Sequence, residues 1–150
     1  MSEPVLITEN DFHIQDEINA LRKMGVGAIV TFTGIVRDHA DNLDLKAMTL
    51  EHYPGMTEEQ ILLIVNEAQK RWPVTGIRVI HRVGRLAPLD NIVFVGTASA
   101  HRQAAFDSAA FIMDYLKTKA PFWKKEKTSA GEKWVDARLS DDAALKKWKR

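Results

Sequence analysis

The chain has 150 residues, of which 45% are hydrophobic and 27% are charged. This length suffices for one domain with a buried core, so we expect a single domain over residues 1–150. The composition is ordinary for a globular protein and excludes a disordered chain. The chain has no cysteine. This excludes disulfides, thiolate zinc sites and a cysteine nucleophile or persulfide on this chain.

Net charge is only +1, but the charge is unevenly distributed. Residues 117–150 carry eleven Lys or Arg against five Asp or Glu, whereas residues 1–116 carry ten against fifteen. A basic C-terminal third favours a local anion site, although a solvated surface explains the charge equally well. The first residues do not resemble a signal peptide, and no apolar run approaches the ~20 residues of a membrane helix. We therefore expect a cytoplasmic protein.

Apolar spacing in the N-terminal half alternates between the periods of strands and helices. It predicts strands over 5–8, 27–34 and 47–53, and a helix through Ile14, Ile18 and Leu21 that ends at Gly25. Residues 38–46 are polar, and we expect a mobile loop there. Thr57, followed three residues later by Gln60, fits a capping box for a helix over 57–72.

In the C-terminal half the pattern predicts strands over 77–82 and 91–98, joined by a turn that contains Pro88. From Ala100 to about Lys117 the chain is strongly helical, with apolar residues on nearly all sides. Residues 122–126 and 133–137 predict a hairpin around Gly131. Residues 140–150 are charged and lack a sustained apolar face, so we expect a flexible tail. Together these elements predict an α+β domain with helices packed on a largely antiparallel sheet.

None of the widespread catalytic motifs is present, neither phosphate loop, dinucleotide fingerprint, nucleophile elbow nor paired-histidine zinc helix. The five histidines, at positions 13, 39, 52, 81 and 101, show no ligand spacing. We therefore expect neither a metal nor a cofactor.

Cations gather at two places where they could bind an anion. Lys117, Lys119, Lys124 and Lys125 surround Pro121, Phe122 and Trp123, a combination that suits a flat anionic ligand. Lysines that complement the dipole of a helix end explain this cluster at least as well. His101 and Arg102 lie in the first turn of a predicted helix, where free N–H groups favour anions. A cation there opposes the dipole, so helix stabilisation explains Arg102 poorly.

Several separate segments, in the same order, resemble the large subunit of molybdopterin synthase. They are Val-Thr-Phe-Thr-Gly (30–34) with Val36-Arg37, Leu-Glu-His-Tyr-Pro-Gly-Met (50–56), Val-Ile-His-Arg-Val-Gly (79–84), Ser-Ala-His-Arg (99–102), Phe-Ile-Met-Asp-Tyr-Leu-Lys (111–117) and Ala-Pro-Phe-Trp-Lys-Lys-Glu (120–126). The likeness spans about residues 25 to 138. Agreement over several unrelated segments is more specific than any single motif.

The resemblance implies a fold of the α/β hammerhead type with an additional small β subdomain. It implies a sulfurtransferase that converts cyclic pyranopterin monophosphate to molybdopterin in molybdenum cofactor biosynthesis. The sulfur would come from the C-terminal Gly-Gly thiocarboxylate of a small ubiquitin-like subunit, which fits the absence of cysteine here. The implied assembly is a heterotetramer with a central homodimer of large subunits, and it involves no nucleic acid and no membrane.

The resemblance also implies the site. Lys117 and Lys124 match the catalytic pair. The implied substrate-binding residues are Lys117, Lys124, Ile35, Val36, Arg37, His101, Arg102, Lys125 and Glu126, with Arg138 as a weaker candidate and Ile35 contributing through its backbone. Lys117 would polarise the thiocarboxylate carbonyl and stabilise developing negative charge, or would accept a proton if its pKa were lowered. The sequence leaves both roles open.

Helix length adds a geometric expectation. If one helix joins His101 to Lys117, the two residues lie roughly 24 Å apart at ~1.5 Å per residue. One pterin cannot touch both residues of one chain, so we expect a site shared between two subunits. Two other classes remain: a nucleic-acid-binding module that uses the basic C-terminal third, and a non-catalytic scaffold that docks a partner.

Overall fold

The computed structural model describes residues 3–135 and 145–149. Its elements, in chain order, are β1 (Val5–Thr8), α1 (Ile14–Leu21), β2 (Ala28–Ile35), β3 (His39–Ala40), β4 (Leu43–His52), α2 (Met56–Arg71), β5 (Val74–Arg82), β6 (Gly84–Leu86), β7 (Asn91–Ser99), α3 (Arg102–Thr118), β8 (Phe122–Thr128) and β9 (Gly131–Val135). No helix in these residues is long and apolar enough to cross a membrane.

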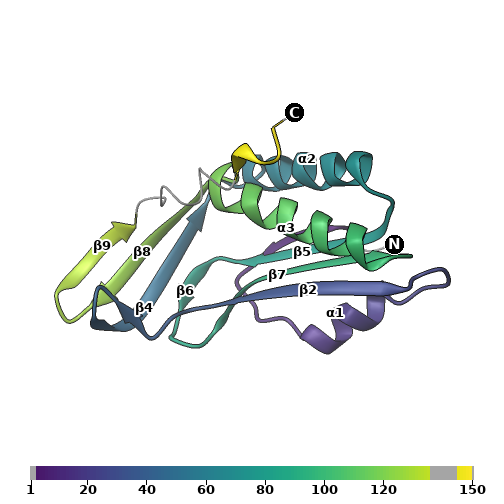
Figure 1. The fold of residues 1–150 in the computed structure, drawn as a ribbon. Helices are drawn as coiled ribbons and strands as arrows, with labels where there is room; N and C mark the ends of the chain where they lie inside the picture. Colours follow the sequence, from purple (N-terminus) through teal and green to yellow (C-terminus); the bar gives the residue numbers. More distant parts are fainter. Residues whose placement is uncertain (1–2, 136–144, 150) are drawn as a thin grey trace.

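The strands form two sheets. The first has the order β1-β5-β7-β2, in which only the β1–β5 pair is parallel. The second has the order β3-β4-β8-β9, with β6 paired to the other edge of β4. Helices α2 and α3 cover one face of the first sheet and α1 covers the other, while the second sheet extends to one side (Figure 1). The expected α+β class is confirmed, and the second sheet is the small β subdomain.

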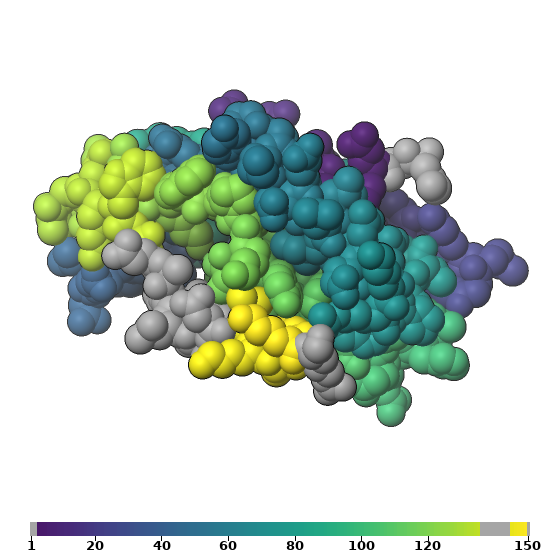
Figure 2. All heavy atoms as spheres, turned by 90° about the horizontal axis from the view of Figure 1, so that it is seen from above, coloured from purple at the N-terminus to yellow at the C-terminus, as the bar shows by residue number. Residues whose placement is uncertain are grey.

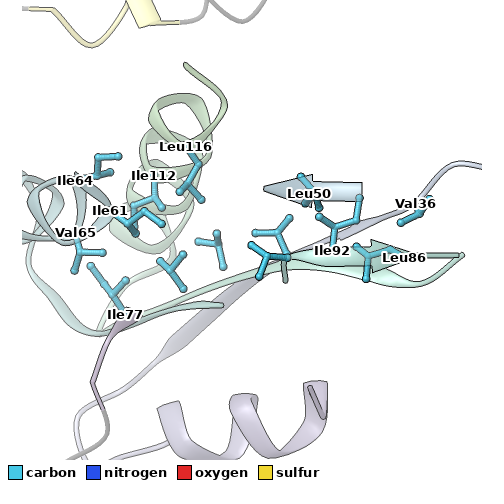
Figure 3. Packing of buried hydrophobic residues seen from close by; sticks show 14 of the residues in the cluster. Val36, Leu50, Ile61, Ile64, Val65, Ile77, Leu86, Ile92, Ile112 and Leu116 are labelled. Carbon is cyan, nitrogen blue, oxygen red and sulfur yellow. The ribbon is translucent and has the colours of Figure 1, made fainter. Parts of the chain in front are cut away.

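The main core lies between the first sheet and the pair α2–α3, and it continues under the second sheet (Figure 3). A smaller cluster of Phe12, Ile80 and Phe94 lies on the α1 side. Because helices cover both faces, residues 92–99 of β7 are all buried, which explains the continuous apolar run of this strand. Gly96 lets α1 approach closely, since a Cβ there would lie 2.7 Å from Leu21 Cδ1.

Two details differ from the sequence predictions in the first half of the chain. Residues 38–46 include a hairpin: β3 and β4 pair across Asp41 and Asn42, whose φ angles of 53° and 65° suit a tight two-residue turn. Whether this hairpin moves stays a prediction. The cap of α2 is also displaced, because Gly55 at φ 86° precedes the helix and its N–H donates to Glu58 Oε1 at 2.9 Å. Thr57 is therefore not the cap.

Two further differences follow from tertiary contacts. β5 begins at Val74, and the short β6 forms against β4, neither of which the local pattern predicted. Of the expected flexible tail, residues 140–144 and 150 lie outside the described residues, and residues 145–149 pack on α2 and α3 (Figure 2). Whether the tail moves stays a prediction. Leu145 is buried, and Trp148 contacts the rings of Trp72 and Phe111 edge-on. Two well-placed apolar side chains anchor this segment without a sustained apolar face.

Candidate functional site

The two lysines of the expected catalytic pair come from different elements that meet at one end of the molecule. Lys117 lies in the last turn of α3 and is exposed, whereas Lys124 is half-buried on β8. The end of α3 lies beside the start of β8 (Figure 1). Two contacts fix the connection between them: Thr57 Oγ1 donates to the Pro121 carbonyl at 3.0 Å, and Phe122 stacks on His81.

The pKa of His81 shows that positive charges lie near its ring. The pKa of His81 is lowered to about 4, chiefly by burial and in smaller part by the positive charges of Lys124, Lys117 and His52. The carbonyl of Arg82, which lies 2.8 Å from Nδ1, opposes this shift. Both lysines are therefore close enough to the same buried ring to act on it electrostatically.

The register of β8 separates the neighbouring candidates. Side chains alternate along a strand, so Lys124 and Glu126 share one face with Phe122, and Lys125 points to the other. Lys125 lies across from Trp134, with its ammonium 5.2 Å from the ring centre and 3.7 Å from Glu132. The structure thus brings Lys124 and Glu126 to one face and leaves Lys125 on the other.

Residues 35–37 follow the end of β2. Val36 is fully buried in the main core, and its N–H and carbonyl bond Asp90 and Leu89 at 2.9 and 2.8 Å. Its side chain therefore anchors the segment in the core, and its two chain neighbours, Ile35 and Arg37, are both exposed. Only these two side chains project from the segment.

Strand register places residues 35–37 near the lysines. Val93 of β7 pairs with Gly34 on one side and with His81 on the other. With neighbouring strands ~4.8 Å apart, Gly34 and His81 are separated by roughly 10 Å. Arg37 therefore belongs to the same end of the first sheet as His81.

His101 and Arg102 lie at the opposite end. His101 precedes α3 as its N-cap and Arg102 is its first residue, and both are exposed. Ser99, two residues before His101, pairs with Ala28 at the start of β2. Six residues of β7 separate Ser99 from Val93, or roughly 20 Å at ~3.4 Å per residue. The helix α3 is continuous from Arg102 to Thr118, so nothing within this chain brings His101 to Lys117.

Arg138 lies outside the described residues. Within residues 3–135 and 145–149, no group of three or more His, Asp or Glu side chains is placed to hold a metal ion.

Sequence reasoning missed His81 as part of the site. The residue was visible only as one of five scattered histidines, although it occupies the inward position in the alternation Ile77, Val79, His81 of a buried strand. That position was the available signal, because a titratable side chain on the core face of a strand requires an explanation.

Comparison with known proteins identifies the family. Residues 7–119 match the family described as MoaE protein. The chain belongs to this family. A molybdopterin synthase catalytic subunit from Pseudomonas aeruginosa is 52% identical over 146 residues, covering 96% of this chain and 97% of that protein. The protein of the same description from Escherichia coli is 59% identical over 122 residues, covering 81% of each.

Solved structures agree with this MoaE assignment. The molybdopterin biosynthesis MoaE protein from Burkholderia ambifaria superposes with a TM-score of 0.84 at 52% identity, covering 98% of each chain. A complex of subunits 1 and 2 of molybdopterin-converting factor from Helicobacter pylori matches with a TM-score of 0.75 over 91% of this chain and 92% of that one. At 17% identity the second likeness concerns the fold alone.

Proposed function

We propose that this protein is the catalytic subunit of a molybdopterin synthase, a sulfurtransferase that converts cyclic pyranopterin monophosphate to molybdopterin. The observation that supports this function is that Lys117 from α3 and Lys124 from β8 both lie near the buried His81 at one end of a MoaE-family fold. Two cations from separate elements can hold and polarise an anionic acyl group between them.

The sulfur arrives on a partner. We assign this role to a small ubiquitin-like carrier with a C-terminal Gly-Gly thiocarboxylate, because this chain has no cysteine to carry sulfur. The thiocarboxylate sulfur attacks a side-chain carbon of the pterin: a carbon–sulfur bond forms, the carbon–oxygen bond at that carbon breaks, and the oxygen takes up a proton as it leaves. Water then cleaves the bond between this sulfur and the carrier's acyl carbon. Sulfur stays on the pterin in place of oxygen, the carrier leaves as a carboxylate, and a second carrier repeats the exchange.

Each site residue has a role in this scheme. Lys117 and Lys124 stabilise the negative charge that develops on the carrier's carbonyl oxygen as its carbon is attacked. Arg37, His101 and Arg102 bind the cyclic phosphate and pterin oxygens through charge-assisted hydrogen bonds. Ile35 contributes its backbone, and Val36 holds this segment in place. Glu126 shares the face of Lys124. Lys125, on the other face of β8, adds only long-range positive charge, and the role of Arg138 in binding substrate is carried over from the family resemblance alone.

We further propose that the site is shared between two copies of the chain. Two observations support this. The unbroken helix α3 separates His101 from Lys117 by roughly 24 Å, and the register of β7 separates Ser99, near His101, from Val93, near the lysines, by roughly 20 Å. Exposed apolar side chains are available for self-association: Phe32 on the edge strand β2 is 40% exposed and Phe106 on α3 is 58% exposed.

The two rival classes have less support. A nucleic-acid module needs unpaired cations, yet three lysines of the basic C-terminal third are within ion-pair distance of carboxylates: Lys125 with Glu132, Lys133 with Asp41, and Lys147 with Asp114. A passive scaffold gives no reason for the two lysines to meet around a buried histidine.

The function is tested by mixing the purified protein with a thiocarboxylated carrier and cyclic pyranopterin monophosphate. Mass spectrometry should detect the dithiolene product and the carrier returned as a carboxylate. Carrier with an ordinary carboxylate C-terminus is the matched control and should give no product. Absence of product with authentic thiocarboxylate would contradict the proposed function.

A further inference from the structure

His81 is the one titratable side chain that is buried among the described residues, with 7% of its surface exposed. It lies near the end of β5, on the face that Ile77 and Val79 turn toward α2 and α3. Placing an imidazole among apolar side chains costs free energy unless its polar atoms find partners. A branched aliphatic side chain would fill the same space without this cost, so the presence of a flat ring calls for a reason.

The contacts of the ring define its chemical state. Nδ1 lies 2.8 Å from the carbonyl oxygen of Arg82, and since a carbonyl only accepts, Nδ1 carries the proton. The ring is uncharged at neutral pH, because burial and the neighbouring cations disfavour a second proton. Its flat face stacks on Phe122, with ring centres 3.8 Å apart and planes inclined by 18°.

Phe122 links the ring to both catalytic lysines. It is the first residue of β8, and Lys124 follows two positions later on the same face of the strand. Lys117 lies five positions earlier, at the end of α3. The stack on His81 and the bond from Thr57 to the Pro121 carbonyl therefore clamp the chain between the two lysines. On β4, His52 pairs directly with Phe122, so a second histidine lies beside Phe122 on the neighbouring strand.

We propose that His81 is a positioning residue for the lysine pair. Its neutral, flat ring holds Phe122, and through Phe122 it fixes Lys124 relative to Lys117. A positively charged side chain in its place would repel both lysines, and a branched aliphatic one would fill the space but could not stack. The inference rests on the proposed function only in calling Lys117 and Lys124 the reacting lysines.

The test compares two substitutions that both fill the space. His81→Phe keeps a flat uncharged ring, whereas His81→Leu removes the planar face. In the complete complex with thiocarboxylated carrier and pterin substrate, His81→Leu should lower kcat about tenfold, as expected for small misplacement of a catalytic group. The KM for the pterin should change by less than about twofold, because Arg37, His101 and Arg102 bind the substrate. His81→Phe should keep at least half of the wild-type kcat.

A matched control separates positioning from stability. Ile80 is the adjacent residue of β5, is fully buried, and faces Phe12 and Phe94 on the α1 side. Ile80→Val should lower the melting temperature but leave kcat unchanged. Wild-type kcat in His81→Leu would overturn the proposal. A loss in His81→Phe equal to that in His81→Leu would also overturn it, since the ring nitrogens and not the stack would then matter.

A second measurement is independent of turnover. Carbon-13 labelling of lysine side chains reports the surroundings of each ammonium group by NMR. The signal of Lys124, assigned by its loss in Lys124→Ala, should shift in His81→Leu and return near its original position in His81→Phe. An unchanged Lys124 signal in His81→Leu would overturn the inference. If instead the wild-type protein makes no product while these shifts occur, the proposed function fails and the positioning role stands.

Discussion

The indole N–H of Trp148 donates to Asp114 Oδ2 at 2.6 Å, and this bond ties the C-terminal segment to the helix that carries Lys117. Arg71 of α2 donates to the Trp148 carbonyl at 2.7 Å, so the segment is held by both helices. Asp114 lies one turn before Lys117 on α3. The C-terminal segment therefore braces the end of α3 that faces the site.

Replacement of Trp148 with Ala should lower the free energy of unfolding by about 2 kcal/mol, less than for a fully buried Trp because this ring is half-buried. The loss combines the ring contacts with Trp72 and Phe111 and the bond to Asp114. Urea denaturation measures it. Trp148→Phe keeps an aromatic ring and should cost only about 1 kcal/mol. Equal stability of Trp148→Ala and wild type would show that the tail does not brace the helices.

Elements with a strong local pattern could be predicted from the sequence. The apolar spacing from Ala100 predicts α3, and β-branched runs predict β2 and β7. These predictions succeed because the apolar pattern of a single helix or buried strand depends only on residues that are close together in the sequence. The hairpin β8–β9 follows from Gly131 between two short runs. The lysine pair came from family resemblance, since the spacing of Lys117 and Lys124 alone did not distinguish a site from a solvated helix end.

Features that depend on partners distant in sequence could not be predicted. β6 forms because β4 has an edge free to pair with it, and the hydroxyl of Thr57, which lies inside α2, donates to the Pro121 carbonyl, 64 positions away. Trp148 is anchored by Trp72 and Asp114, which no local pattern in a charged tail indicates. His81 falls in the same class, because its role depends on Phe122 from another sheet.

His81 should make the stability of the protein depend on pH between about 6.5 and 4. Its pKa is lowered from 6.5 to about 4, first by burial and then by the charges of Lys124, Lys117 and His52. As pH falls, the unfolded chain binds a proton first, so the unfolded state gains stability relative to the folded one. The free energy of unfolding that depends on uncharged His81 is fully present above pH 6.5. It falls progressively as the pH falls toward 4, by up to about 3 kcal/mol.

The substitution His81→Phe isolates this effect, because phenylalanine keeps the stack and does not titrate. Urea denaturation at several pH values between 7 and 4.5 should give a shallower fall in the free energy of unfolding for this variant than for wild type. Carboxylates titrate in both proteins and cancel in the difference. Parallel curves for the two proteins would mean that His81 accepts its proton at an ordinary pH in the folded state.

Lys117→Ala should lower turnover about a hundredfold or more while the protein stays folded, because it removes charge at the reacting acyl group. Lys124→Ala should also be severe, with more residual activity. Lys119 is the matched control: it is exposed, lies two residues after Lys117 and caps α3. Lys119→Ala should keep nearly full activity in single-turnover assays with thiocarboxylated carrier. Half or more of wild-type turnover in Lys117→Ala would refute its catalytic role.

The shared site predicts complementation between two inactive variants. Arg102→Ala and Lys117→Ala should each be nearly inactive as homodimers. After both are unfolded together and reassembled, about half of the dimers should contain one chain of each kind. In such a dimer one site combines an intact Lys117 with the partner's intact arginine, and the other site lacks both. Activity should therefore return to roughly a quarter of wild type.

A second mixture controls for recovery by any other route. Lys117 and Lys124 meet within one chain around His81, so each site takes both lysines from the same subunit. Lys117→Ala mixed with Lys124→Ala should then recover no activity, because every site in every dimer retains one defect. Subunit exchange is verified by native mass spectrometry with one chain isotopically labelled. If exchange is complete and the first mixture stays inactive, Arg102 and Lys117 serve the same site from one chain. The continuous helix of α3 would then have to break when the substrate binds.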